Sequence, residues 1–144
     1  MFEAIIRHTA KGKVDVLSAG TQATFVHPLA IKVLAEAGIL SDKQISKRIS
    51  QLNEARDLLE FEDQNGKKTS IKLSKITHVV TLCGNAKEAC PIFPTRVKHE
   101  HWPIDDPDKY KGAEAKILPH FREARDEIMK RAEKFVQEYL LTRV

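Results

Sequence analysis

Residues 77–107 read THVVTLCGNAKEACPIFPTRVKHEHWPIDDP, and this stretch decides the predicted fold. An apolar, β-branched run leads to Cys83, and a second extended run from Val97 to Ile104 follows Cys90. Both runs are typical of β-strands. The second run ends on Asp105-Asp106-Pro107. Because ligands bind at the edge of an open parallel α/β sheet where the strands end, thiols and acids are predicted at that edge.

The composition is that of one ordinary domain, which we expect to span residues 1–144. The chain is 42% hydrophobic and 31% charged, which is enough for a core and ordinary for a soluble protein. No apolar run is long enough to cross a bilayer and no signal peptide is recognisable, so we expect a cytoplasmic protein without membrane contact. The net charge of +4 comes from charges of mixed sign, so no nucleic-acid partner is expected.

Elsewhere the pattern predicts helices that alternate with strands, which is typical of an α/β sandwich on a mostly parallel sheet. A strand is predicted over Val14–Leu17. Two helices are predicted early in the chain, one from Phe2 to before Gly12 and one from Pro28 to Gly38. A third should start at Ser41 or Asp42, with Ile45 and Ile49 facing inward, and a fourth should cover Asn53–Leu59. The last helix is predicted from Pro119 onward, and its apolar stripe consists of Phe121, Ala124, Ile128, Ala132, Phe135 and Tyr139.

A β-hairpin is predicted within residues 57–75. Residues 59–62 alternate between apolar and polar side chains, and so do residues 70–73. Between them, Asn65-Gly66 is the strongest short turn signal in the chain. The hairpin should therefore have one polar face.

The two cysteines, Cys83 and Cys90, are seven residues apart. If the segment between them were helical, they would lie about 10 Å apart, beyond the ~7 Å limit for a disulfide. A bridge therefore requires this segment to unwind, and Gly84 and Asn85 make it pliable. An unwound, exposed disulfide suits exchange with a redox partner. The alternative is a pair of reduced, partly buried cysteines without a function.

Asp105 and Asp106 precede a proline, which restricts the backbone before it. A carboxyl held there can protonate a leaving oxygen, although a plain turn acid is the alternative. His99 and His101 share a strand face, but their spacing from the cysteines fits no familiar zinc pattern. We therefore expect no metal ion and no cofactor, and a scaffold role for His101.

Seven short motifs occur in a known order over most of the chain: Ser18-Ala19-Gly20, His27-Pro28, Val79-Val80-Thr81-Leu82-Cys83, Cys90-Pro91-Ile92, Glu100-His101-Trp102, Asp105-Asp106-Pro107 and Arg125-Asp126-Glu127-Ile128. From Val14 onward the chain thereby resembles the thioredoxin-coupled arsenate reductases, which share the low-molecular-weight tyrosine phosphatase fold. The resemblance implies a three-layer sandwich with a mostly parallel sheet. The two-cysteine pattern separates this family from plain phosphatases.

The resemblance also implies a relay of three thiols that reduces arsenate to arsenite and is regenerated by thioredoxin. Cys83 would be the second thiol, Cys90 the third and Asp106 the general acid. Glu3, Ser18 and Gln51 match positions that hold a potassium ion in some family members, and we expect no ion here.

The family begins with a central strand and a Cys-x5-Arg-Ser phosphate loop, whereas Met1 matches a point inside the helix that follows. We therefore expect this chain to lack the first strand and the nucleophile, and to be inactive toward arsenate alone. A homodimer is one way to cover the sheet edges thus exposed. Two alternatives remain open: a catalytically dead phosphatase-fold protein that binds or regulates, and a thiol–disulfide protein that uses only Cys83 and Cys90.

Overall fold

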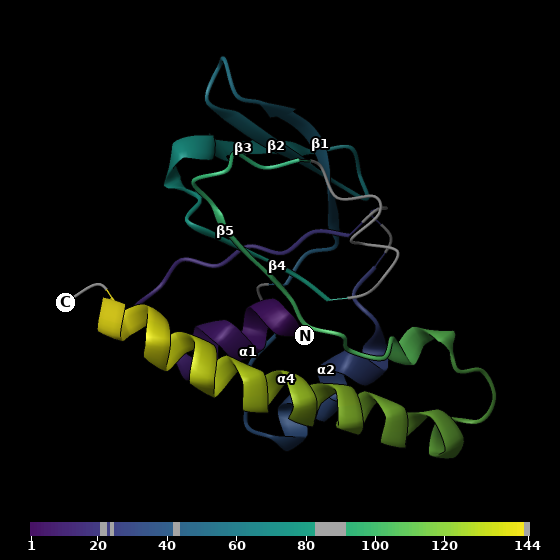
Figure 1. Ribbon diagram of the computed structural model, residues 1–144. Helices are drawn as coiled ribbons and strands as arrows, with labels where there is room; N and C mark the ends of the chain where they lie inside the picture. Colours follow the sequence, from purple (N-terminus) through teal and green to yellow (C-terminus); the bar gives the residue numbers. More distant parts are fainter. Residues whose placement is uncertain (21–22, 24, 42–43, 83–91, 143–144) are drawn as a thin grey trace. The chain divides into compact units, whose positions relative to one another are not determined.

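A computed structural model describes residues 1–20, 23, 25–41, 44–82 and 92–142. In chain order the elements are α1 (Phe2–Thr9), α2 (Pro28–Glu36), β1 (Lys47–Asn53), β2 (Leu58–Asp63), β3 (Lys68–Lys72), the 3-10 helix η1 (Leu73–Lys75), β4 (His78–Thr81), β5 (Lys98–His101), the 3-10 helix η2 (Pro107–Lys109) and α4 (Glu114–Thr142) (Figure 1). They divide into two compact units, which are described separately. The helical unit comprises Met1–Ser18, Val26–Gln44 and Ile104–Val144, and the strand unit comprises Ala19–Phe25 and Ile45–Pro103.

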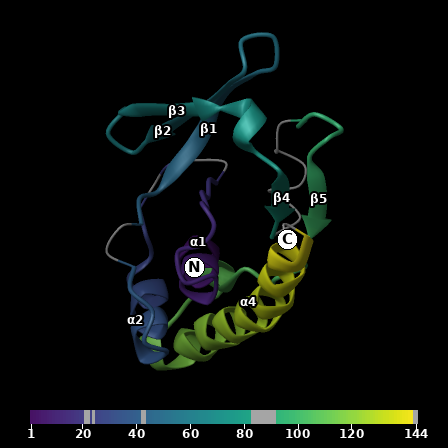
Figure 2. The ribbon, with the colours of Figure 1, turned by 90° about the vertical axis from the view of Figure 1, so that its left-hand side faces the viewer.

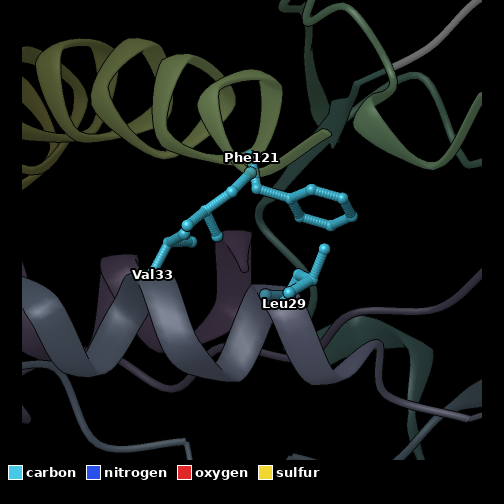
Figure 3. Close-up of a cluster of buried hydrophobic side chains, with 5 residues drawn as sticks. Leu29, Val33 and Phe121 are labelled. Atoms are coloured by element: carbon cyan, nitrogen blue, oxygen red, sulfur yellow. The ribbon is translucent and has the colours of Figure 1, made fainter. Parts of the chain in front are cut away.

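In the helical unit, α4 runs alongside both α1 and α2 (Figures 1 and 2). Side chains of α2 and α4 form one buried apolar cluster, made of Leu29, Ala30, Val33, Leu118 and Phe121 (Figure 3). Further along α4 the buried stripe continues with Ala124, Ile128, Ala132 and Val136. At the surface, Arg122 and Arg125 of α4 both donate to the carboxylate of Glu36 at the end of α2. Apolar burial and these ion pairs thus hold the two helices together.

The strand unit contains an antiparallel sheet in the order β1-β2-β3 and a separate parallel pair, β4 and β5 (Figure 2). The predicted hairpin is confirmed as β2 and β3, and β1 extends it to three strands. Its buried face carries Leu59 and Phe61, which lie in one cluster with Leu73, Phe93 and Val97. In the parallel pair, His78 is opposite Lys98 and Thr81 is opposite His101. The Trp102 amide extends this pairing by donating to the Thr81 carbonyl at 2.8 Å.

Two predicted helices are wrong. Ile49, expected on a helix that starts at Ser41 or Asp42, lies in β1, because residues 47–53 pair with β2, with one irregularity of register between Ile49 and Gln51. Asn53–Leu59, also expected to be helical, turns the chain from β1 into β2. Asn53 Oδ1 accepts the Arg56 amide in this turn, and Asp57 adopts a φ of 52°. Hydrogen bonding to a neighbouring strand outweighed the weak local helical pattern.

One predicted boundary is shifted, and one predicted strand is not among the described strands. The last helix begins at Glu114 rather than at Pro119, so Pro119 lies inside α4, where it has no amide hydrogen for the helical hydrogen bond. Val14–Leu17 forms none of the described strands. The Val16 carbonyl instead accepts from the Arg7 side chain at 3.3 Å. Among the described helices, none combines the length and apolar content that a bilayer crossing requires.

Candidate functional site

The acidic turn, defined as Asp105–Tyr110, is the predicted site region that the structure describes. Cys83 and Cys90 fall within residues 83–91, outside the described part of the chain. The geometry of the site is therefore built from the acidic turn and the helices that contact it in the helical unit.

Asp106 is the N-cap of η2, and its side chain has a defined partner. Its backbone is extended, with φ −71° and ψ 111°, as expected before Pro107. The Asp106 Oδ1 atom accepts the Asp108 amide at 3.0 Å. Pro107 is buried at the first position of the short helix. The sequence Asp-Pro-Asp therefore both makes the turn and orients the Asp106 carboxyl.

Asp105 is held as an anion. Lys109 Nζ donates to its Oδ1 atom, and the Tyr110 hydroxyl donates to its Oδ2 atom at 2.6 Å. These two hydrogen bonds, that of Lys109 first, lower the pKa of Asp105 below its ordinary value, and they raise the pKa of Lys109 and of Tyr110. Asp105 therefore stays ionised at neutral pH and serves as an acceptor.

The Tyr110 ring joins the acidic turn to α4. It lies flat on the His120 imidazole, with ring centroids 3.4 Å apart and an angle of 3° between the planes. Contact between stacked rings is favourable, so it helps to hold the end of the turn against the first turns of the helix. The turn is thus supported by a tertiary contact as well as by its own hydrogen bonds.

The two neighbouring carboxyls consequently have different chemical capacities. The Asp105 carboxyl accepts from a cation and a hydroxyl, whereas the Asp106 carboxyl accepts from the Asp108 amide alone among the described residues. A general acid must be able to take up and release its proton during the reaction. Of the two, Asp106 is better suited to that task.

Glu3 forms a second polar network, away from the acidic turn. Its carboxylate is 5% exposed and accepts from the Ser18 amide at 3.0 Å, the Ser18 hydroxyl at 2.6 Å and Arg7 at 2.8 Å. The structure thus joins Glu3 and Ser18, two of the three positions that match an ion site. Gln51 belongs to the strand unit. Three protein donors satisfy the buried carboxylate, as a charge in an apolar interior requires.

The strand histidines have separate partners. His101 Nδ1 lies 2.7 Å from the Thr81 hydroxyl across the parallel pair, which confirms the predicted scaffold role of His101. His99 instead lies edge-to-face with Phe93, with ring centroids 6.2 Å apart. Within the described residues, no cluster of three or more His, Cys, Asp or Glu side chains is arranged to hold a metal ion.

The sequence contains one further pattern: Cys90 and Arg96 by themselves match the spacing Cys-x5-Arg. Two of the five intervening residues are proline, and proline has no amide hydrogen to donate to an oxyanion. The Arg96 guanidinium donates to the Ile76 carbonyl at 2.7 Å and to the Leu73 carbonyl at 2.8 Å. Arg96 therefore binds backbone carbonyls within the strand unit, which is not the role of the arginine in a phosphate loop.

Comparisons with known proteins agree with this architecture. The sequence profile of the low molecular weight phosphotyrosine protein phosphatases matches residues 1–142. An arsenate reductase of Shouchella clausii is 36% identical over 137 residues, which cover 95% of this chain and 85% of the relative. An arsenate reductase of Bacillus subtilis is 36% identical over 122 residues, which cover 85% of this chain and 74% of the relative.

A solved structure gives the same result. It is described as an arsenate reductase in the reduced state and superposes with a TM-score of 0.61 at 25% sequence identity. The match covers 96% of this chain and 86% of that structure. It confirms the predicted phosphatase-like α/β fold.

Proposed function

Because the chain belongs to the low molecular weight phosphotyrosine protein phosphatase family, and its relatives include arsenate reductases, we propose that it serves the reduction of arsenate to arsenite. The observation that carries this proposal is the match to an arsenate reductase over 95% of the chain. That match spans both the Cys83–Cys90 segment and the acidic turn.

The electrons of the proposed reaction balance through thiols. Reduction of As(V) to As(III) takes two electrons, and two thiols that become one disulfide supply them. A first thiolate bonds to arsenic, and an oxygen leaves as water. Cys83 then attacks that sulfur, so that arsenite departs with the electron pair. Cys90 attacks Cys83, frees the first thiol and leaves the Cys83–Cys90 disulfide, which a thioredoxin dithiol reduces.

In this scheme Asp106 donates the proton that lets the arsenate oxygen leave as water. The contrast with Asp105 supports this assignment, since Lys109 and Tyr110 keep Asp105 charged. General acids of this kind contribute roughly 10²–10⁴-fold to a rate.

The first thiol must come from outside these residues. The 144 residues contain two cysteines, and the scheme uses both as the second and third thiols. We therefore propose that the chain by itself does not turn over arsenate. We also propose a cytoplasmic location, where thioredoxin keeps thiols reduced, and a homodimer as the state in which exposed sheet edges are covered.

Two measurements test the proposal. In the first, mild oxidation followed by mass spectrometry should yield an intramolecular Cys83–Cys90 disulfide, which thioredoxin with its reductase should reduce with consumption of NADPH. Cys83→Ser and Cys90→Ser are the matched controls, since each removes one of the two thiols. Failure to form the bridge contradicts the relay.

In the second measurement, a strand and Cys-x5-Arg-Ser loop taken from a family member are joined ahead of Met1. Arsenate-dependent NADPH consumption is expected with this fusion and absent without it. A fusion that folds, has both thiols reduced and still leaves arsenate unchanged contradicts the proposed function.

A further inference from the structure

His27 is the N-cap of α2, an uncommon position for this residue type. Its Nδ1 atom accepts the Leu29 amide at 3.1 Å. Helices prefer Asn, Asp, Ser or Thr there, because these short side chains offer the same acceptor. Histidine adds a second ring nitrogen, so a role for Nε2 would account for its use here.

The cap fixes where the ring carries its proton. A neutral imidazole whose Nδ1 accepts a hydrogen bond has its proton on Nε2. The His27 Nε2 atom lies 3.5 Å from Oδ1 of Asp108. The ring is also held against Phe121 of α4, with centroids 4.6 Å apart. The His27 Nε2 atom is therefore held within ion-pair distance of the Asp108 carboxylate.

Asp108 connects this contact to the candidate acid. While its carboxylate faces His27, its backbone amide donates to Oδ1 of Asp106 at 3.0 Å. Both groups belong to one residue of η2, so restraint of the side chain also restrains the amide. We propose that His27 is a positioning residue, which acts through Asp108 to hold the amide that orients Asp106. The inference rests on the proposed function for the role of Asp106 as acid.

The competing explanation is that His27 serves only as a helix cap. The contact with Asp108 is long for a hydrogen bond, and the Asp108 side chain is 65% exposed. Loss of the contact should therefore have a modest effect: the hydrogen bond from the Asp108 amide to Asp106 should open about fivefold more often. Two substitutions of His27 separate the helix cap from the contact with Asp108. Asparagine places its polar atoms near the position of Nδ1, which caps the helix, and glutamine places them near the position of Nε2, which faces Asp108.

The test compares His27→Asn and His27→Gln by NMR in the full chain, with amide hydrogen exchange as the readout. The Asn variant should keep the Leu29 amide protected, while the Asp108 amide exchanges about fivefold faster. The Gln variant should show the reverse pattern. In the unsubstituted protein, ¹⁵N spectra of the His27 ring should show the proton on Nε2.

Equal exchange of the Asp108 amide in the Asn variant and the unsubstituted protein would overturn the proposal, and so would a His27 ring with its proton on Nδ1. If either variant fails to fold, Asp108→Asn decides, since loss of the carboxylate should shift the His27 Nε2 resonance. An unchanged resonance counts against the link. None of these readouts depends on arsenate turnover. If the fusion with the phosphate loop is inactive, the proposed function is refuted, but the NMR test of His27 can still be read.

Discussion

The Tyr110 hydroxyl donates a 2.6 Å hydrogen bond to Oδ2 of Asp105, while the Tyr110 ring lies flat on His120. One side chain thus helps to lower the pKa of a carboxyl, together with Lys109, and also links the acidic turn to α4. The same turn contains two neighbouring aspartates, and this contact is one reason why they differ chemically.

Tyr110→Phe should raise the pKa of Asp105 toward its ordinary value, because the substitution removes one of the two hydrogen bonds that lower it. A ¹³C NMR titration of the side-chain carboxyl measures the change. Tyr139→Phe is the matched control, because residue 139 is about 28 Å further along the helix from residue 120. An Asp105 pKa unaltered by the Tyr110 substitution would show that Lys109 alone holds the charge.

Asp106→Asn should lower arsenate turnover by roughly 10²–10⁴-fold in the fusion that carries the phosphate loop, because an amide cannot donate the acid proton. Asp105→Asn is the control for loss of a neighbouring carboxylate, and it should cost less. Steady-state rates of NADPH consumption measure both. A larger loss from the Asp105 variant would reverse the assignment of the acid.

Ser74→Ala should lower the stability of the strand unit at neutral pH. Ser74 donates to the Asp57 carboxylate through its amide at 2.6 Å and its hydroxyl at 2.7 Å, and both bonds lower the pKa of Asp57. A lowered folded pKa stabilises the fold above the ordinary Asp pKa of about 3.9, and this stabilisation is lost as the pH falls through the folded value. The variant should therefore differ from the unsubstituted protein more at pH 7 than at pH 2.

Urea unfolding at the two pH values measures that difference. Ser70→Ala on the exposed strand β3 is the control and should change little at either pH. A Ser74→Ala deficit that stays constant from pH 7 to pH 2 would exclude the Asp57 carboxylate as its cause.

Leu34→Ala should destabilise the protein by about 2–5 kcal/mol, because Leu34 is fully buried and truncation leaves a cavity. Leu40→Ala, at a leucine that is 82% exposed, should change the free energy of unfolding by about 0.5 kcal/mol or less. Chemical denaturation of both variants gives the comparison. Similar losses at the two positions would show that Leu40 is covered in solution.

Arg96→Ala should lower stability by about 1 kcal/mol or more, because its guanidinium holds two backbone carbonyls. In the fusion that carries the phosphate loop, it should leave phosphate binding unaltered, because the Arg96 guanidinium donates to backbone carbonyls. Denaturation and calorimetric titration with phosphate test the two parts. Arg56→Ala, at an exposed turn arginine, is the matched control, and a loss of phosphate affinity specific to the Arg96 variant would show that Arg96 contacts the anion.

Several elements follow from the sequence alone, because their signals are local. Pro28 begins α2 and Gly38, with φ +72°, follows its end, as the residue preferences predict. Asn65-Gly66 marks the turn between β2 and β3, where Gly66 has a φ of +81°. The β-branched run after Thr77 gave β4, and the order of motifs identified the family.

Other features were decided only by tertiary structure. Ile49 fits a helical spacing, yet β1 forms because β2 offers it a ladder of backbone hydrogen bonds. Asp105 and Asp106 look alike as neighbours in the sequence, and contacts in the folded turn with Lys109 and Tyr110 make one of them a fixed anion. Residue type and spacing determine turns, caps and motifs, whereas strand partners and the environments of carboxyls depend on which groups folding brings together.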